Sequence, residues 1–214
     1  MKPYQREFLD FVVETGALRF GQFRLKSGRN SPYFFNAGEF NSGARLARLG
    51  EFYARTLDDH GLAPDMIFGP AYKGIPLVSA TAIASWQLFA IDLPFAFNRK
   101  EVKDHGEGGI IIGAPLQGRV LIIDDVVSAG ISVDESVSII RARDAEPAGV
   151  VIALDRCERA STGTAGAVAS IRARHGIDVF AVVDLRTLIA YLETHENLRG
   201  HLDAVQEYYQ RYGE

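Results

Sequence analysis

Residues 120–132 read VLIIDDVVSAGIS, an apolar stretch that ends in two adjacent carboxylates and a turn of small residues. The apolar part, residues 120–123, is short and β-branched, which is typical of a strand buried on both faces of a parallel sheet. Residues 134–141 follow with acidic side chains in the first turn of an expected helix. A strand, a small-residue loop and a helix N-terminus together direct free backbone N–H groups at one point. The stretch therefore predicts an anion-binding loop, with Asp124 and Asp125 placed for sugar hydroxyls or for Mg²⁺ carried by a phosphate ester.

The composition limits the class of protein. The 214 residues suffice for one domain with a full hydrophobic core, and 47% hydrophobic and 23% charged residues are typical of globular proteins in solution. A net charge of −4 argues against general binding to nucleic acid or to an anionic membrane. Cys157 is the only cysteine, so no disulfide forms within the chain, and we expect a cytoplasmic location. Residues 74–91 carry no charge, but their polar side chains predict a buried helix rather than a membrane span.

Strand and helix patterns alternate from about residue 42 onward. This alternation predicts an α/β fold with a mostly parallel central sheet and helices on both of its faces. We expect strands at residues 65–68, 93–97, 110–112, 120–123, 149–154 and 177–183. Before them, residues 4–14 predict an amphipathic helix and residues 17–40 a hairpin or small sheet. No repeat, low-complexity tract or long linker interrupts the chain, so we expect one structural domain.

Ligands of parallel sheets bind at the carboxyl ends of the strands, and two further loops should reach that edge. Residues 69–76 lie between a strand and a helix, where Lys73 adds a charge to the backbone amides. Residues 98–109 combine three cations and a histidine with glycines, which predicts a mobile lid over a polyanion. The plainer alternatives are a strand with a solvated acidic cap at 124–132, a turn with a surface lysine at 69–76 and a solvated loop at 98–109.

Two other segments carry side chains that suit an anionic ligand. Lys26, Phe34 and Phe35 fall on a predicted hairpin, where rings and a cation can stack on and pair with a flat anionic ring. Arg156 follows a predicted strand and suits bidentate binding of a carboxylate. The plainer alternatives are a core hairpin with an exposed lysine and a surface ion pair. Cys157 lacks a Cys/His catalytic pattern around it, so we expect a structural role.

Several enzyme classes lack their motifs in this sequence. There is no Gly-x-x-x-x-Gly-Lys-Ser/Thr run, which argues against a P-loop kinase or NTPase. No Gly-x-Gly-x-x-Gly run follows a predicted strand, which argues against a dinucleotide-binding fold. The five histidines do not have the spacing of a zinc site.

Residues 124–130 resemble the motif with which type I phosphoribosyltransferases bind phosphoribosyl pyrophosphate (PRPP). Within that family, residues 25–29 with 34–38, residues 69–74 and residues 98–109 are similar to the orotate phosphoribosyltransferases, in matching order and spacing along nearly the whole chain. The resemblance implies the type I phosphoribosyltransferase fold, with residues 1–40 as an N-terminal helix and hood over the base site and residues 41–214 as the core. It also implies Mg²⁺-dependent transfer of phosphoribose from PRPP to orotate, giving orotidine 5′-monophosphate and pyrophosphate in UMP biosynthesis.

The resemblance implies a role for each matched side chain. The residues implied in catalysis are Lys103, His105, Asp124 and Asp125. The residues implied in orotate binding are Lys26, Phe34, Phe35, Ser128 and Arg156. The residues implied in PRPP binding are Lys26, Tyr72, Lys73, Arg99, Lys100, Lys103, His105, Asp124, Asp125, Val126, Val127, Ser128, Ala129, Gly130, Ile131 and Ser132. Mg²⁺ would be held mainly by PRPP, without a direct protein ligand but with Asp124 and Asp125 nearby, and a homodimer would share the lid across its interface.

The phosphate loop departs from the family pattern at two positions. Ser128 stands where threonine is usual and keeps the hydroxyl, whereas Ile131 stands where threonine is usual and loses it. A hydroxyl that contacts phosphate contributes roughly 1.5–3 kcal/mol. Because backbone amides should still hold the phosphate, we expect weaker PRPP binding rather than loss of activity.

Two other functions stay open on the sequence alone. One is a phosphoribosyltransferase for a purine or for uracil, against which Lys26 with Phe34 and Phe35 argues. The other is a PRPP-sensing regulator without catalysis. That class usually carries a nucleic-acid-binding region, whereas residues 1–40 are not basic enough for one, and a complete lid would have no purpose in it.

Overall fold

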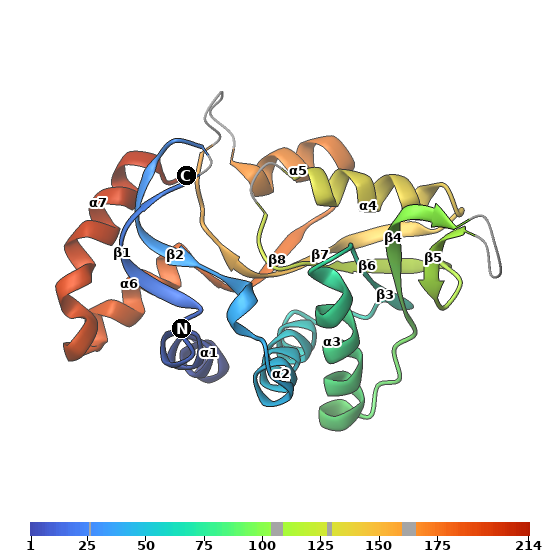
Figure 1. The fold of residues 1–214 in the computed structure, drawn as a ribbon, viewed down its shortest axis with the longest axis horizontal. Helices are drawn as coiled ribbons and strands as arrows, with labels where there is room; N and C mark the ends of the chain where they lie inside the picture. Colours follow the sequence, from blue (N-terminus) through green and yellow to red (C-terminus); the bar gives the residue numbers. More distant parts are fainter. Residues whose placement is uncertain (26, 104–108, 128–129, 160–165) are drawn as a thin grey trace.

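The structure is a computed structural model that describes residues 1–25, 27–103, 109–127, 130–159 and 166–214 (Figure 1). Its central sheet has six strands among these residues. In spatial order they are β5 (Gly109–Gly113), β4 (Phe95–Lys103), β3 (Met66–Gly69), β6 (Arg119–Ile123), β7 (Glu146–Asp155) and β8 (Val179–Asp184). All neighbouring pairs are parallel except β4 and β5, which are antiparallel. The predicted α/β fold with a mostly parallel sheet is confirmed.

Helices cover both faces of the sheet, as expected (Figure 1). On one face lie α1 (Pro3–Glu14), α2 (Gly43–Asp59) and α3 (Gly74–Phe89), and on the other lie α4 (Ile131–Arg141) and α5 (Ala167–His175). The side chains of β6 explain this arrangement: Leu121 and Ile123 pack in the core of the first face, and Val120 and Ile122 pack in the core of the second. All four are at most 1% exposed, so the apolar stretch at 120–123 is a strand buried on both sides.

A small two-stranded sheet lies beside the C-terminal helices. It consists of the antiparallel strands β1 (Leu18–Arg24) and β2 (Asn30–Phe35), followed by the 3-10 turn η1 (Ala37–Glu39). The chain ends in α6 (Leu185–Thr194), η2 (Glu196–His201) and α7 (Leu202–Tyr212). Tyr33 of β2 is completely buried and meets Tyr208 of α7 edge to face, with ring centroids 6.1 Å apart. The N-terminal hairpin is therefore packed onto the end of the chain.

Three local predictions are wrong. Residues 99–103 belong to β4, where Lys103 pairs with Gly109 of β5, rather than to a loop. Helix α4 begins at Ile131, three residues before the acidic stretch, because Gly130 takes the left-handed φ of +80° and starts the helix there. Helix α3 is not fully buried, since its outer face exposes large apolar side chains, which are Ile83, Trp86 and Leu88, followed by Ile91.

The contact between α2 and α3 explains which face of α3 turns inward. Gly50 of α2 is buried, and a Cβ atom placed on it would lie 2.5 Å from the carbonyl oxygen of Ala80. Small residues on α3 thus allow the two backbones to approach closely, while Ile83, Trp86 and Leu88 lie on its outer face. In the described part of the chain, none of the helices has both the length and the apolar character needed to cross a membrane.

Candidate active site

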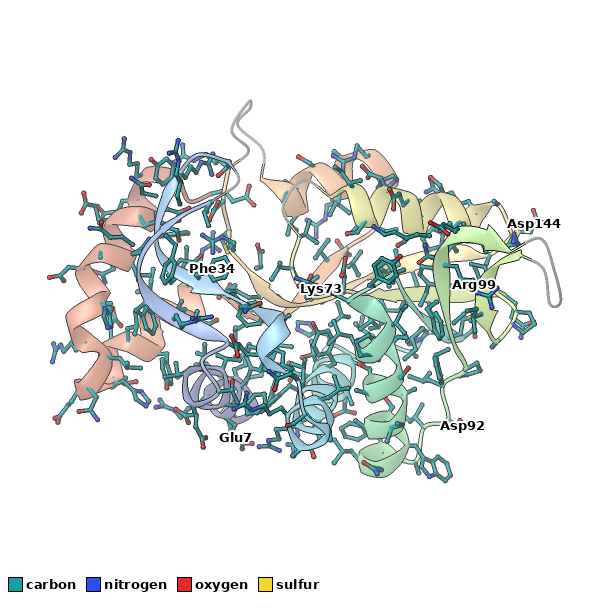
Figure 2. All side chains as sticks on the ribbon, viewed as in Figure 1. Glu7, Phe34, Lys73, Asp92, Arg99 and Asp144 are labelled. Atoms are coloured by element: carbon teal, nitrogen blue, oxygen red, sulfur yellow. The ribbon has the colours of Figure 1, made fainter. Side chains whose placement is uncertain are left out.

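The loops after β3 and β6 meet at the carboxyl edge of the sheet. The Lys73 ammonium lies 2.6 Å from Oδ2 of Asp125, which joins the two loops by an ion pair. The backbone N–H of Ala71 donates to Oδ1 of the buried Asn98, at 2.8 Å, and so ties the first loop to β4. Figure 2 shows Lys73 at the N-terminal end of α3, between Phe34 and Arg99. The structure thus brings Lys73, Asp125 and Asn98 to this edge of the sheet.

The loop after β3 is tight because its glycines allow two backbone segments to approach closely. A Cβ atom on Gly69 would lie 2.2 Å from the carbonyl oxygen of Gly74. A larger residue would push the start of α3 away from the sheet. Since Lys73 directly precedes that helix, the close approach of these two backbones fixes where its charge emerges.

Asp124 and Asp125 are nearly buried, at 5% and 6% exposure. The Asp124 carboxylate accepts a hydrogen bond from the Ser132 hydroxyl at 2.7 Å and one from the Asp125 backbone N–H at 2.9 Å. Its backbone carbonyl accepts a hydrogen bond from the Tyr53 hydroxyl at 2.7 Å. Burial, reinforced by the charge of Asp125 and opposed by the Ser132 hydrogen bond, raises the pKa of Asp124 to about 6. Two close carboxylates held this firmly suit hydroxyl groups or a metal-bound ligand.

The start of α4 presents its backbone toward the same edge. Gly130 is the N-cap residue, Ser132 turns back to Asp124, and Ile131 leaves an apolar side chain 64% exposed. The side chains of Val126 and Val127 pack against the two core clusters, so these residues offer a ligand only their backbone. Ser128 and Ala129 lie outside the described residues.

The structure describes some of the cationic side chains expected at the site, together with Tyr72. The Tyr72 side chain is 69% exposed, and the Lys100 ammonium lies 5.4 Å from the centre of its ring. Arg99 is half-buried on β4. The described chain includes the backbone of Lys103 but not its side chain, and His105 and Lys26 lie outside the described residues.

The two phenylalanines of β2 do not form one stacking surface. Adjacent residues of a strand point to opposite faces, and here Phe34 is 38% exposed while Phe35 packs against Phe40, with ring centroids 6.2 Å apart. The Phe34 ring stacks on that of Phe23 at 5.5 Å. Of the pair, Phe34 is therefore the ring that a ligand can reach.

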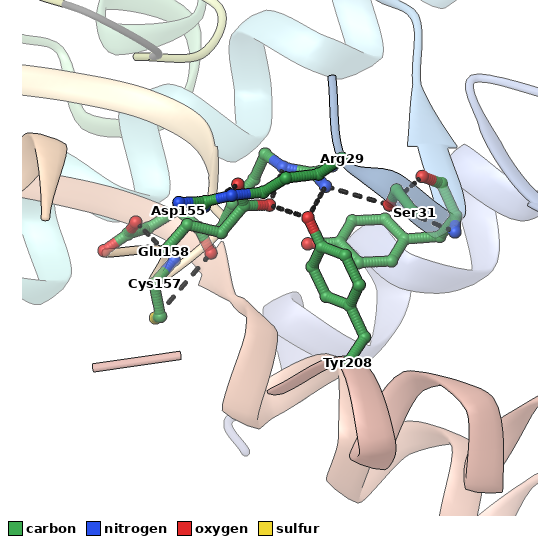
Figure 3. Close-up of polar contacts among 8 residues, drawn as sticks. Arg29, Ser31, Asp155, Cys157, Glu158 and Tyr208 are labelled. Carbon is green, nitrogen blue, oxygen red and sulfur yellow. Dashed lines mark hydrogen bonds and ion pairs between the residues drawn. The ribbon is translucent and has the colours of Figure 1, made fainter. Parts of the chain in front are cut away.

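Arg156 follows β7 and belongs to a half-buried network rather than to a surface ion pair (Figure 3). It pairs with Glu158, and it also bonds to Ser31 of β2 and Tyr208 of α7. Sequence reasoning missed these partners, because two of them lie 125 and 52 residues away in the chain. Cys157 is buried, which raises the pKa of its thiol to about 12 and suits the expected structural role.

Carboxylate, imidazole and thiol groups are the side chains that could hold a metal ion. Within the described ranges, no group of three or more His, Cys, Asp or Glu side chains gathers closely enough to hold a metal ion. The carboxylate oxygens of Asp124 and Asp125 are hard donors at this edge of the sheet.

Comparisons with known proteins agree with the geometry. The family model described as the phosphoribosyl transferase domain matches residues 36–183. Orotate phosphoribosyltransferases of Methylococcus capsulatus and Thioalkalivibrio sulfidiphilus are each 57% identical over 213 residues, covering 100% of this chain and 99% and 100% of theirs. The crystal structure of the Francisella tularensis orotate phosphoribosyltransferase is 40% identical, with a TM-score of 0.87 over 97% of this chain and 100% of that one. The Mycobacterium tuberculosis enzyme in complex with PRPP shares the fold at 21% identity, with a TM-score of 0.63 over 87% of this chain and 99% of that one.

Proposed function

Since the chain belongs to the orotate phosphoribosyltransferases, enzymes of UMP biosynthesis, we propose how its residues transfer phosphoribose from PRPP to orotate. The observation that supports the proposal best is the buried Asp124–Asp125 pair, joined to Lys73 at the carboxyl edge of the sheet. In this proposal the two carboxylates accept hydrogen bonds from the ribose hydroxyls. Residues 128–132 would wrap the 5′-phosphate at the start of α4 with their backbone amides.

Bond cleavage at the anomeric carbon passes through a transition state with oxocarbenium character, and the leaving group is the pyrophosphate polyanion. Stabilisation of that leaving charge by fixed cations should dominate catalysis. We assign this task to the cationic set of the site, which comprises Lys73, Arg99, Lys100, Lys103 and His105, together with Tyr72. In this proposal the hairpin of β4 and β5, which carries Arg99, Lys100 and Lys103, closes over the pyrophosphate and excludes water, which would otherwise hydrolyse the oxocarbenium ion.

Mg²⁺ is the cofactor that fits these residues. The buried carboxylates of Asp124 and Asp125 are oxygen donors of the type it prefers, and each is already oriented by a hydrogen bond or ion pair. Held mainly by the pyrophosphate group of PRPP, Mg²⁺ supplies charge neutralisation as that group leaves.

For the base we assign Arg156 and Lys26 to the charged edges of orotate, with Ser128 beside it. Phe34 would contact the ring with its exposed side chain, and Phe35, whose side chain is packed inward, would act through its backbone. Residues 1–40, which include β1 and β2, would form the hood over this base site, and residues 41–214 the phosphoribosyltransferase core.

The direct test is an assay of the purified protein with Mg²⁺, PRPP and orotate, followed by the loss of orotate absorbance. Turnover of orotate is expected, while uracil and purine bases in the same assay should not be consumed at comparable rates. A protein that binds PRPP but converts no base, or that prefers another base, contradicts the proposal.

We propose that the enzyme is a homodimer whose subunits meet through α3. The apolar side chains of Ile83, Trp86 and Ile91 are 58%, 59% and 48% exposed on one face of this helix and its C-terminal end. Exposed patches of large apolar residues mark interaction surfaces, and a second copy would cover this one with an equivalent face. The lid of one subunit would then reach the active site of its partner.

Trp86→Glu is expected to convert the dimer to a monomer, because a charge at the centre of a buried apolar interface cannot be solvated. Sedimentation equilibrium should give twice the 23.5 kDa chain mass for the wild type and the single mass for the variant. Trp86→Phe keeps the apolar contact and should stay dimeric. A wild-type protein that is monomeric and fully active contradicts the proposed dimer.

Ile131→Thr is expected to tighten PRPP binding by roughly 10- to 100-fold, because the new hydroxyl at the exposed start of α4 can donate to the 5′-phosphate. Isothermal titration with PRPP and Mg²⁺ measures the change in Kd. Ile131→Val is the matched control, since valine has the shape of threonine without the hydroxyl. An unchanged Kd in the threonine variant, or an equal gain in the valine variant, shows that the hydroxyl does not contact phosphate.

A further inference from the structure

A closed set of polar contacts holds the Arg156 guanidinium from two sides, and Figure 3 shows its partners Ser31, Glu158 and Tyr208. Its Nε donates to Oε1 of Glu158 at 2.6 Å, and its Nη2 donates to the Ser31 hydroxyl at 2.9 Å. The same Nη2 lies 3.4 Å from the Tyr208 hydroxyl, which itself donates to Oε1 of Glu158 at 2.8 Å. Tyr208 therefore bridges the arginine and its counter-charge.

Aromatic rings fix the plane of the same guanidinium. Its central carbon lies 4.3 Å from the ring centre of Tyr33 and 5.9 Å from that of Tyr208. The Tyr33 ring is completely buried, so the packing around it holds in place the ring on which the Arg156 guanidinium rests. Side chains from β2, α7 and the segment after β7 thus position one cation.

The contacts leave one edge of the guanidinium for a ligand. Nε and Nη2 make the hydrogen bonds described above, and none of the hydrogen bonds within the described part of the chain uses Nη1. Both N–H groups of Nη2 are engaged by Ser31 and Tyr208, so a carboxylate can accept a charge-assisted hydrogen bond from Nη1. Arg156 is therefore held through Nε and Nη2 and open at Nη1.

The Glu158 carboxylate competes with a ligand carboxylate for Arg156. Hydrogen bonds from other donors to Glu158 weaken this competition. Oε2 of Glu158 lies 3.3 Å from Nη1 of Arg29, and Oε1 accepts the Tyr208 hydroxyl. Burial and the neighbouring Glu158 charge raise the pKa of Tyr208, so its hydroxyl keeps the proton that it donates. Each of these donors draws negative charge on Glu158 away from Arg156.

We propose that Tyr208 is a positioning residue that presents Arg156 to the carboxylate of orotate and so sets the preference for a carboxylated base. The inference rests on the proposed function, in which Arg156 binds the base. Without the Tyr208 hydroxyl, Glu158 turns more fully to Arg156, and the guanidinium loses a contact that orients its open edge. Recognition of the carboxylate weakens, whereas contacts to PRPP are unaffected.

Tyr208→Phe keeps the ring and removes only the hydroxyl. We expect its KM for orotate to rise roughly 5- to 20-fold, with kcat and the KM for PRPP unchanged within twofold. Tyr209→Phe is the matched control on the same helix, because the Tyr209 hydroxyl bonds to Arg186 and to the backbone of Glu214 instead. This control should behave as the wild type.

Product binding separates positioning from a purely structural role. Orotidine 5′-monophosphate and uridine 5′-monophosphate differ only by the carboxylate, so Tyr208→Phe should weaken binding of the first nucleotide and leave the Kd of the second unchanged. Equal weakening of both, or no change in either, overturns the inference. If the wild type does not convert orotate at all, the proposed function fails; if it does and Tyr208→Phe matches it, only the role of Tyr208 fails.

Discussion

Asp124→Asn is expected to stabilise the fold at neutral pH while it impairs the use of PRPP. The pKa of Asp124 rises from 3.8 to about 6 because the carboxylate is buried, and a shift of that size corresponds to about 3 kcal/mol of destabilisation at pH 7. Asparagine carries no charge; its side-chain oxygen can accept the hydrogen bond from the Asp125 backbone N–H, and its amide can donate to the Ser132 hydroxyl oxygen. The variant should therefore be up to about 3 kcal/mol more stable in denaturant titrations at pH 7.5.

The raised pKa of Asp124 also predicts how the stability gain of Asp124→Asn changes with pH. Between pH 3.8 and about 6 the unfolded chain has lost the Asp124 proton while the folded chain keeps it, so wild-type stability falls as the pH rises through this window. The advantage of asparagine should consequently be present at pH 7.5 and absent at pH 3.5. Asp125→Asn, which breaks the ion pair with Lys73, should give no such gain. An Asp124→Asn protein that is no more stable at pH 7.5, or equally stabilised at both pH values, contradicts the assignment.

The same substitution should lower kcat/KM for PRPP by roughly 10- to 100-fold, because a charged acceptor for a ribose hydroxyl is lost. The wild-type enzyme should show the matching effect of protonation, with the KM for PRPP rising as the pH falls through about 6. Steady-state kinetics between pH 5 and pH 8 measure both. Stability and activity thus change in opposite directions at this residue.

Lys103→Ala is expected to lower kcat by roughly 100- to 1,000-fold, since one fixed cation that acts on charge in the transition state contributes about this much. The KM for orotate should stay unchanged, because the lid faces the pyrophosphate. Lys2→Ala is a suitable control, as Lys2 pairs with Asp59 away from the site. Intact kcat with a raised KM for orotate would place Lys103 at the base instead.

A mixing experiment locates the lid. If Lys103 reaches the partner's site, a hybrid of one Lys103→Ala and one Asp124→Asn subunit has one site with both defects and one site with neither. Random mixing of the two impaired variants should then restore roughly a quarter of wild-type turnover. No recovery on mixing indicates that the lid serves its own subunit.

Local patterns predicted the parts of the fold that depend on neighbours in the chain. Residues 120–123 alternate between two cores, and the acidic pair follows them directly, so the strand and the polar edge could be read from thirteen residues. The start of α4 was missed because it depends on the left-handed backbone of Gly130, which the acidic pattern does not reveal. Residues 99–103 read as a loop because their strand pairing with β5 is made across the chain and not by their own polarity.

The sequence did not predict the features that depend on contacts between residues far apart in the chain. The sequence of the uncharged helix at 74–89 does not predict which of its faces is exposed, because hydropathy depends on residue type and not on which elements pack against the helix. Arg156 was a candidate for carboxylate binding, but its partner Tyr208 comes from the last helix of the described chain. The chemistry at the ends of strands was therefore predictable, and its supporting contacts were not.

The close fit of Gly50 against Ala80 makes a position remote from the substrate a determinant of kinetics. Any side chain at Gly50 must displace α3, because the first added carbon already meets the backbone of Ala80. Helix α3 begins immediately after Lys73, so its displacement moves that ammonium relative to Asp125. Inherited or engineered changes at this glycine would thus present as catalytic defects in a protein whose reacting groups are all intact.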